Sequence, residues 1–266
     1  MLPEEPIALG RTAEIYAWED GWVLKLFYGW FSEESVRTEA KLARAVQVAG
    51  LPVPAVGEIL EIGNRLGLPY RRVDGPTILA QVHARPWTIP KFSRLLAALQ
   101  AEMHETAAVA GLPLQQQRLE TKIRRAEGLS PELRAAALEA LAAMPQGERL
   151  CHGDLHVDNV LITAQGPVVI DWIDATAGRP LADVARSSVI LLGILAPDSG
   201  ATWVERIAAR WHHRIYLGHY FRLRPGGKDE YRAWRPIVAA ARMSEGMAEI
   251  QGWLGSQVEK GLGSVG

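Results

Sequence analysis

The chain has 266 residues, of which 48% are hydrophobic, enough for one domain with a sizeable core. Its formal net charge is −1 at pH 7, so it lacks the basic surplus typical of nucleic-acid-binding proteins. The segment Met1–Pro6 lacks the basic and apolar regions of a signal peptide, and the longest apolar run, Val189–Pro197, is too short to span a bilayer. A single cysteine, Cys151, excludes an internal disulfide. These features indicate a cytoplasmic protein with no membrane partner.

The first seventy-odd residues predict a small antiparallel sheet. Ile15–Trp18 and Gly21–Phe27 are β-prone runs joined by a short polar turn, which favours a hairpin. Further strands are expected near Val56–Ile62 and Leu68–Val73, with a turn at Gly63–Arg65 between them.

A helix should connect the two pairs of strands. Ser32 can cap it, and the helix should end near Gly50. Glu39 lies along the apolar stripe of this helix, and an unpaired buried carboxylate is costly. Lys25, the one cation within an apolar strand, is the nearest partner by topology. The alternatives are a Lys25 side chain that reaches to water and a surface ion pair of Glu39 with Arg37 or Arg44.

The chain should leave the sheet at Asp74–Pro76 and become helical. Helices are expected at Lys91–Val109, Gln115–Glu127, Pro131–Met144 and Val184–Leu195. His104 lies beside the apolar stripe of the first of these helices, which favours a hydrogen-bonded core histidine. Asp183 is expected either to cap the last helix or to bind the backbone of the loop near residue 154.

The segment His152–Asn159, followed by Asp171, carries the strongest indication of chemistry. Asn159–Ile162 and Pro167–Asp171 form a predicted hairpin, so Asn159 and Asp171 should meet across it, with Asp154 on the loop that enters the same end. Carboxylate and amide oxygens suit Mg²⁺. Phosphoryl transfer can use this set: Asp154 orients the acceptor hydroxyl and accepts its proton, while Asn159 and Asp171 hold the metal.

The same segment resembles two other kinds of site, a zinc site and a nucleophilic cysteine, but its residues disfavour both. His152 and His156 are four residues apart, as in helical zinc sites, but Gly153 stands where such a site needs Glu, and glycine disfavours a helix. Cys151 is adjacent to His152, but consecutive strand residues point to opposite faces, so a buried small side chain is favoured over a nucleophile.

These residues resemble the aminoglycoside phosphotransferase and choline kinase-like family of small-molecule kinases, whose catalytic loop reads H-G-D-x-x-x-x-N. The match covers His152–Asn159, Ile170–Trp172 and Gly178–Ala185, with Arg179 where an acidic residue is more usual. The resemblance implies an α+β, protein-kinase-like, two-lobed fold. A small, mainly antiparallel β lobe over residues 1–74 would bind the nucleotide. A larger, mainly helical lobe over residues 75–266 would hold the catalytic loop and the acceptor.

The resemblance also implies ATP, or GTP, with Mg²⁺ as cofactors, and assigns residues to them. Lys25, fixed by Glu39, would steady the phosphates. The loop that covers the phosphates would comprise Gly10, Arg11 and Thr12. Tyr70 would border the adenine pocket, and the backbone of Arg71 and Val73 would face the adenine edge.

The acceptor is expected to be a small hydroxylated molecule, with no obligate protein partner. An aminoglycoside antibiotic is the first expectation, and choline, homoserine or a sugar is the alternative. A nucleotide-binding pseudokinase that serves as an interaction module is the rival of a different class. Residues 201–266 hold ten Lys or Arg against six Asp or Glu. A polycationic acceptor would therefore require four acids to gather at the cleft: Asp229, Glu230, Glu245 and Glu249.

Overall fold

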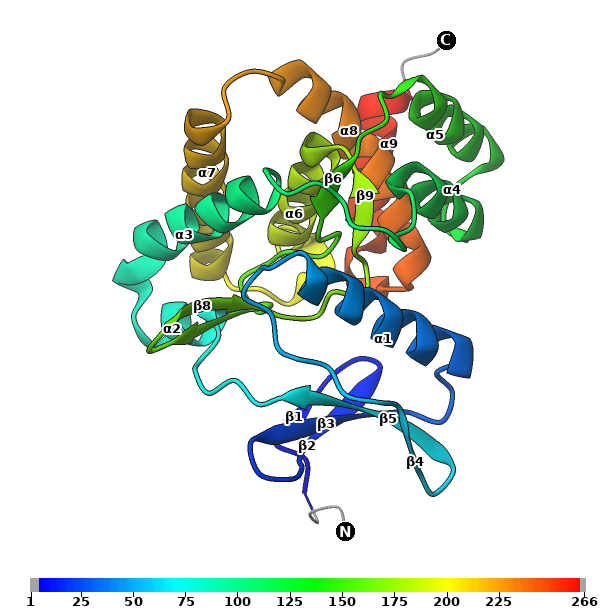
Figure 1. Cartoon of the computed structure of the whole chain (residues 1–266). Helices are drawn as coiled ribbons and strands as arrows, with labels where there is room; N and C mark the ends of the chain where they lie inside the picture. Colours follow the sequence, from blue (N-terminus) through cyan, green and yellow to red (C-terminus); the bar gives the residue numbers. More distant parts are fainter. Residues whose placement is uncertain (1–4, 264–266) are drawn as a thin grey trace.

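The computed structural model describes residues 5–263. Residues 1–4 and 264–266 lie outside the described part. They include the outer ends of both expected lobes and most of the segment Met1–Pro6, in which no signal peptide is expected. Figure 1 shows a small sheet with one helix below a larger group of helices. This is the α+β, two-lobed arrangement that the sequence predicts, with an antiparallel sheet in the smaller lobe.

The smaller lobe is a five-stranded antiparallel sheet in the order β1-β2-β3-β5-β4. Its strands are β1 (Ala8–Leu9), β2 (Ala13–Ala17), β3 (Trp22–Phe27), β4 (Leu60–Ile62) and β5 (Arg65–Arg71). The two later strands differ from the prediction. Residue 56 makes only an isolated bridge to Tyr70 before β4 begins, and β5 starts earlier because Gly63, with a positive φ of 62°, allows a tighter turn.

Helix α1 (Glu33–Val48) forms as predicted and lies between the sheet and the larger lobe (Figure 1). The Ser32 side chain accepts a hydrogen bond from the Ser35 N–H, which caps the first turn. Val36 and Ala40 pack with Phe27 and Leu68 in the small core of this lobe. The packing fixes which face of α1 is turned toward the sheet.

The larger lobe is mainly helical. Its helices are α2 (Ile78–Ala84), α3 (Ile89–Met103), α4 (Gln115–Arg125), α5 (Pro131–Ala143), α6 (Pro180–Gly193), α7 (Trp203–Leu223), α8 (Lys228–Arg242) and α9 (Ala248–Leu262). Helix α3 ends before the predicted residue 109. Helix α6 begins earlier than predicted, because Pro180 occupies its first position and leaves Asp183 inside the first turn.

The larger lobe also contains two pairs of short strands (Figure 1). Strands β7 (Val160–Thr163) and β8 (Gly166–Val169) form the predicted hairpin. Strand β6 (Arg149–Cys151) pairs with β9 (Thr176–Gly178). The loop between β6 and β7 and the segment between β8 and β9 carry the residues that were expected to do the chemistry.

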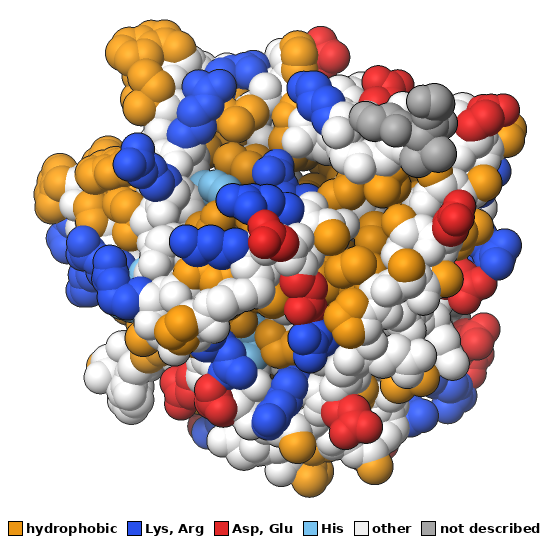
Figure 2. All heavy atoms as spheres, turned by 90° about the horizontal axis from the view of Figure 1, so that it is seen from above, with side chains coloured by type: hydrophobic (Ala, Val, Ile, Leu, Met, Phe, Trp, Pro, Cys, Tyr) orange, Lys and Arg blue, Asp and Glu red, His pale blue; other side chains and the backbone are white. Residues whose placement is uncertain are grey.

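The surface of the larger lobe is unevenly charged. Seen from above, Lys and Arg side chains gather mostly on the left, the side on which Figure 1 places α3 and α7, while Asp and Glu lie mostly on the right (Figure 2). A hollow of about 330 Å³ between α3 and α7 is lined by Arg94, Arg214 and Arg222. Within the described residues, no helix is both long and apolar enough to cross a membrane.

Candidate active site

Gly153 gives the catalytic loop its shape. It has a positive φ of 78°, and a Cβ at this position would collide with the Asp174 carbonyl oxygen. Only glycine fits both the conformation and the space. On either side of it, the His152 ring accepts a hydrogen bond at Nδ1 from the Asp154 N–H (3.1 Å) and donates from Nε2 to the Ile170 carbonyl (3.1 Å). The loop is therefore fixed to the end of the hairpin.

Asp183 anchors the same loop from α6. Its carboxylate accepts hydrogen bonds from the backbone N–H of Gly153 (2.7 Å) and of His152 (3.3 Å). Gln100 Nε2 (2.8 Å) and His104 Nε2 (3.1 Å) donate to the same carboxylate. Of the two roles expected for Asp183, the structure shows backbone binding of the loop.

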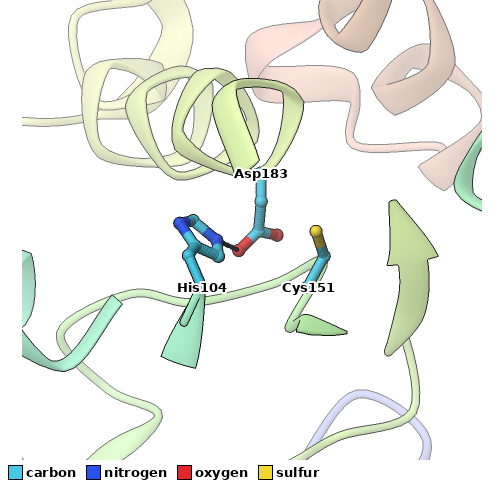
Figure 3. Close-up of side chains that lie close together, drawn as sticks. All are labelled: His104, Cys151 and Asp183. Carbon is cyan, nitrogen blue, oxygen red and sulfur yellow. Dashed lines mark hydrogen bonds and ion pairs between the residues drawn. The ribbon is translucent and has the colours of Figure 1, made fainter. Parts of the chain in front are cut away.

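His104, Cys151 and Asp183 converge in the interior (Figure 3) and have the residue types of a metal site. Both His104 nitrogens are already engaged, because Nε2 donates to Asp183 and Nδ1 lies 2.7 Å from the Tyr220 hydroxyl. Burial raises the pKa of the Cys151 thiol well above its usual range, so the residue stays protonated. The group is a buried hydrogen-bonded cluster, in agreement with the predictions for His104 and Cys151.

The zinc alternative is also at odds with the structure. His156 Nδ1 accepts from the Asp158 N–H (3.2 Å), and the segment from His152 to His156 is a loop, not a helix. Burial lowers the pKa of His152, which keeps the ring neutral. Both histidines hold backbone and carboxylate groups in place.

Asp154 is ionised and held by two side chains. Arg186 Nη2 lies 3.0 Å from its Oδ1, and His156 Nε2 lies 3.5 Å from its Oδ2. Burial alone would raise the pKa of Asp154, but the His156 hydrogen bond and the Arg186 charge lower it well below its usual range. A carboxylate with so low a pKa is a weak base, so its main contribution is to orient a hydroxyl group.

Asn159 and Asp171 lie at the same end of the hairpin, but not as direct partners. The register pairs Val160 with Val169, and the Ile170 N–H donates to the Asn159 carbonyl (3.0 Å), so Asn159 faces Ile170. The predicted register was therefore wrong by one residue. Asp171 leaves the ladder because it takes a left-handed conformation, with φ of 61°, the only such residue besides glycine among those described.

Lys25 makes the predicted ion pair and also one that was not predicted. Its Nζ lies 2.7 Å from Glu39 Oε1 and 3.2 Å from Asp171 Oδ1. Burial alone would lower the pKa of Lys25, but the two carboxylates raise it above its usual range. The Tyr70 hydroxyl donates to the same Glu39 oxygen (3.0 Å). Lys25 thus joins β3, α1 and the segment after β8.

The residues expected around the nucleotide are only partly brought together. Gly10 is in a tight turn, where its N–H donates a hydrogen bond to the Ala13 carbonyl (2.9 Å). The carbonyl of Thr12 accepts a hydrogen bond from the Tyr28 N–H (3.0 Å). Arg11 Nη2 reaches the Glu245 carbonyl of the larger lobe (2.8 Å), so in this state it bridges the lobes.

The segment after β5 offers limited backbone groups to a purine. The Arg71 N–H is donated to the Ala55 carbonyl (2.7 Å), which leaves Arg71 only its carbonyl oxygen to offer. No hydrogen bond of the Val73 backbone occurs within residues 5–263, so both of its polar groups are open to a ligand. The Tyr70 side chain is turned toward Glu39, and its place beside an adenine stays a prediction.

Two charged residues near Asp154, Arg186 and Asp174, were not assigned to the site from the sequence, and Glu245 was named only as a possible contact for a cationic acceptor. Arg186 contacts Asp154, Glu245 contacts Arg186 (2.6 Å), and Asp174 is held by Arg118 (2.6 Å) and Lys122 (3.0 Å). Arg186 lies three residues after Asp183, one helical turn along α6, which is a spacing that could have indicated it. The other contacts depend on how distant helices pack.

The four acids expected to attract a cationic acceptor do not gather. Glu230 forms a two-point ion pair with Arg179 (both contacts 2.9 Å), Asp229 pairs with its neighbour Arg232, and Glu249 is exposed. Glu245 is the member of the set that contacts a side chain bound to Asp154.

Comparison with known proteins agrees with this geometry. Residues 4–226 match the family model described as the phosphotransferase enzyme family. The chain belongs to that family. This confirms the family resemblance inferred from the catalytic loop.

One relative by sequence is a much longer protein. A mouse protein, acyl-CoA dehydrogenase family member 10, is 27% identical over 180 residues, which is 59% of this chain but 17% of that protein. The chain thus spans about a sixth of the length of this relative.

Solved structures share the fold. A thermostable mutant of aminoglycoside phosphotransferase APH(4)-Ia, in ternary complex with ADP and hygromycin B, has a TM-score of 0.68 at 16% identity and covers 100% of this chain and 95% of its own. A choline/ethanolamine kinase family protein from Mesorhizobium loti has a TM-score of 0.62 at 15% identity. The match covers 99% of this chain and 89% of that protein's chain. At this identity the likeness concerns the fold.

Proposed function

We propose that the protein is a Mg²⁺-dependent kinase that transfers the γ-phosphoryl group of ATP, or of GTP, to a hydroxyl group of a small molecule. The observation that carries the proposal is the junction at Lys25. Its Nζ lies 2.7 Å from Glu39 and 3.2 Å from Asp171, one residue beyond the backbone partner of Asn159. A buried lysine fixed by a helix carboxylate is the arrangement that steadies nucleotide phosphates in kinases.

In the proposed reaction the Asp154 carboxylate accepts a hydrogen bond from the acceptor hydroxyl and so aims its oxygen at the γ-phosphorus. A bond forms between that oxygen and the phosphorus, and the bond from the phosphorus to the oxygen bridging the β- and γ-phosphates breaks. The hydroxyl proton passes to Asp154, and ADP leaves. Because the pKa of Asp154 is low, proton transfer comes late and positioning contributes most of the rate.

The donor set at the hairpin end fits Mg²⁺. The Asp171 side chain is 40% exposed and can turn from Lys25 toward an ion, and the Asn159 amide lies beside it with Nδ2 engaged by the Asp154 carbonyl (2.9 Å), which leaves the amide oxygen as the donor. A bound Mg²⁺ would neutralise charge on the phosphates. Gly10, Arg11 and Thr12 are proposed to cover those phosphates, and Tyr70, Arg71 and Val73 to border the purine.

The acceptor is proposed to be a small hydroxylated molecule, without nucleic acid, membrane or obligate protein partner, in the cytoplasm. Structural relatives named for hygromycin B and for choline or ethanolamine share the fold, so the fold does not select between antibiotic and metabolite. The aminoglycoside expectation required an acidic cluster that the four candidate residues do not form. This weakens the case for a polycationic acceptor.

The test is turnover of Mg·ATP by the purified protein with acceptors of many kinds: aminoglycosides, choline, homoserine, sugars and hydroxy acids. We expect release of ADP that depends on one class of acceptor, with phosphorylated product seen by mass spectrometry. Tight nucleotide binding with no turnover on any acceptor would favour the pseudokinase instead. The same assay with GTP in place of ATP decides the nucleotide preference.

A further inference from the structure

A cluster of cationic side chains lies beside the catalytic loop. It comprises Arg118 and Lys122 of α4, Arg186 of α6 and Arg242 of α8, and is called the cation cluster below. Three carboxylates lie among these four cations: Asp154, Asp174 and Glu245. If Asp154 is reserved for the acceptor hydroxyl, two carboxylates remain for four cations.

The carboxylates of the cluster are shared between cations. Asp174 accepts from both Arg118 (2.6 Å) and Lys122 (3.0 Å). Glu245 lies 2.6 Å from Arg186, but 3.5 Å from Lys122 and 3.8 Å from Arg242. The last two contacts are long for charged groups, so Arg242 is only partly neutralised, and Lys122 depends on the Asp174 carboxylate that it shares with Arg118.

Arg242 is the least satisfied member of the cluster. The residue is 9% exposed, and its Nε and Nη1 are buried without a hydrogen-bond partner among the described residues. Burial lowers the pKa of Arg242 to about 10, and the nearby Arg186 charge adds to the effect. Buried charged donors without an acceptor are costly and call for a missing partner.

A cavity lies between three members of the cation cluster and the catalytic loop, and Arg242 does not line it. It has a volume of about 40 Å³ and is lined by Arg118, Lys122 and Arg186 together with Gly153, the residue before Asp154. Thr176, whose buried Oγ1 also has no partner among the described residues, lines the same cavity. One unpartnered hydroxyl and three cationic side chains thus line a space that begins one residue from the catalytic carboxylate.

We infer that the acceptor carries an anionic group, a carboxylate or a phosphate, which binds to Lys122 and Arg242 while its hydroxyl lies against Asp154. The inference rests on the kinase reaction proposed above and specifies its substrate class. Glu245, which binds Arg186 closely (2.6 Å), lies farther from Lys122 and Arg242, and the incoming anion takes its place at these two cations. Arg186 stays with Asp154, and Arg11, which binds the Glu245 carbonyl (2.8 Å), brings a further cation from the smaller lobe.

Two series of acceptors test the inference, because each keeps one hydroxylated frame and changes only the charge. The first is glycerol, glycerate, glycerol 3-phosphate and 3-aminopropane-1,2-diol. The second is glucose, glucuronate, glucose 6-phosphate and glucosamine. We expect kcat/KM at least ten-fold higher for anionic members than for neutral or cationic ones, and the carboxylate and phosphate arms show which anion fits.

Variants locate the effect. Lys122→Gln should raise KM for the anionic acceptor roughly ten-fold or more, as expected for loss of a hydrogen bond to a charged group, and leave KM for its neutral counterpart and for ATP unchanged. Lys122→Arg, which keeps the charge, should restore the preference. Arg124→Gln is the matched control, because Arg124 lies two residues away on α4 and pairs on the surface with Glu120. A purely structural role of Lys122 would affect all acceptors alike.

The outcomes separate the two proposals. Preference for neutral or cationic members overturns the anionic acceptor and leaves the kinase assignment intact. If Mg·AMP-PNP binds but no member is turned over, the shift in melting temperature on adding each acceptor decides: stabilisation by anionic members alone supports the inference, and any other pattern overturns it. If neither ATP nor AMP-PNP binds, the proposed function itself fails.

Discussion

At the scale of single residues, the contacts of Asp154 keep its carboxylate ionised and fix its position. Its backbone N–H is held by His152, its carboxylate by Arg186 and His156, and the preceding peptide by Asp183. Positioning is what phosphoryl transfer chiefly requires of a protein. The hydrogen bonds therefore matter more than the basicity of the carboxylate.

Replacing Asp154 by Asn tests its role directly. The variant keeps the shape of the side chain but loses the charge that orients and deprotonates the acceptor, so kcat should fall roughly 10²–10⁴-fold. Affinity for Mg·ATP, measured by calorimetry, should change little. Near-normal turnover by the Asp154→Asn protein would show that another group does this work.

Gly153 should tolerate no side chain. Gly153→Ala would strain a residue with φ of 78° and drive the Cβ into the Asp174 carbonyl, so we expect a loss of stability of about 2–4 kcal/mol together with loss of activity. Gly200→Ala is the control, since Gly200 has φ of 70° but nothing within 4 Å of the added carbon. Chemical unfolding of both variants separates the collision from backbone strain alone. Equal destabilisation would mean that the collision is relieved by a small shift of the loop.

At the scale of elements, the hairpin β7–β8 places two side chains for the metal. Asp171→Ala should weaken Mg²⁺-dependent ATP binding far more than Asp174→Ala, because Asp171 is partly exposed beside Lys25 whereas Asp174 is taken up by Arg118 and Lys122. Asp174→Ala should instead lower stability, since it removes the carboxylate that pairs with the half-buried Arg118 and Lys122. Calorimetric titration with and without Mg²⁺ measures the first effect. Equal weakening in the two variants would mean that Asp171 has been given the wrong role.

The helices and strands, and some contacts between neighbouring ones, could be predicted from local sequence patterns. The hairpin followed from alternating β-prone residues around a glycine turn, and the Lys25–Glu39 pair followed from the cost of a buried carboxylate on the apolar face of α1. Asn159 faces Ile170 rather than Asp171, because Ile162 pairs with Pro167 and the second predicted strand is one residue longer than the first.

The cation cluster could not be predicted from such local sequence patterns. Lys122 and Glu245 are 123 residues apart, and their meeting depends on the packing of α4 against α8 and against the helical turn that follows α8. No sequence pattern marks Asp174, yet in the structure its half-buried carboxylate lies between Arg118 and Lys122. Local sequence patterns predict which face of a helix or strand is buried and where turns occur. The contacts of the cation cluster depend instead on how distant helices are placed relative to one another.

At the scale of the whole molecule, two contacts join the lobes across the site. Lys25 of the sheet binds Asp171, and Arg11 binds the carbonyl of Glu245. Both involve residues expected to meet the nucleotide, so nucleotide binding should exchange contacts between the lobes for contacts to phosphate. The larger lobe carries most of the buried side chains, and its stability should depend on groups well away from the cleft.

His212 of α7 is one such group. Ser93 donates its only proton to the Ile89 carbonyl (2.6 Å), so the His212 Nδ1–H must donate to Ser93 Oγ (2.8 Å), and the buried Nε2 has no partner among the described residues. Burial lowers the pKa of His212 to about 4. The folded protein therefore holds this imidazole neutral well below the pH at which the unfolded chain takes up a proton.

The consequence is a loss of stability in mildly acidic solution. Between pH 6.5 and pH 4 the unfolded state binds a proton at this position that the folded state does not, so the free energy of unfolding falls as the pH falls. From pH 7 to pH 5 the loss due to His212 should be about 2 kcal/mol, and His212→Gln should lack it. His219→Gln, a change at a partly exposed histidine of the same helix, should retain it. Urea unfolding at both pH values measures the difference, and an unchanged pH dependence in His212→Gln would show that the imidazole titrates normally in the folded protein.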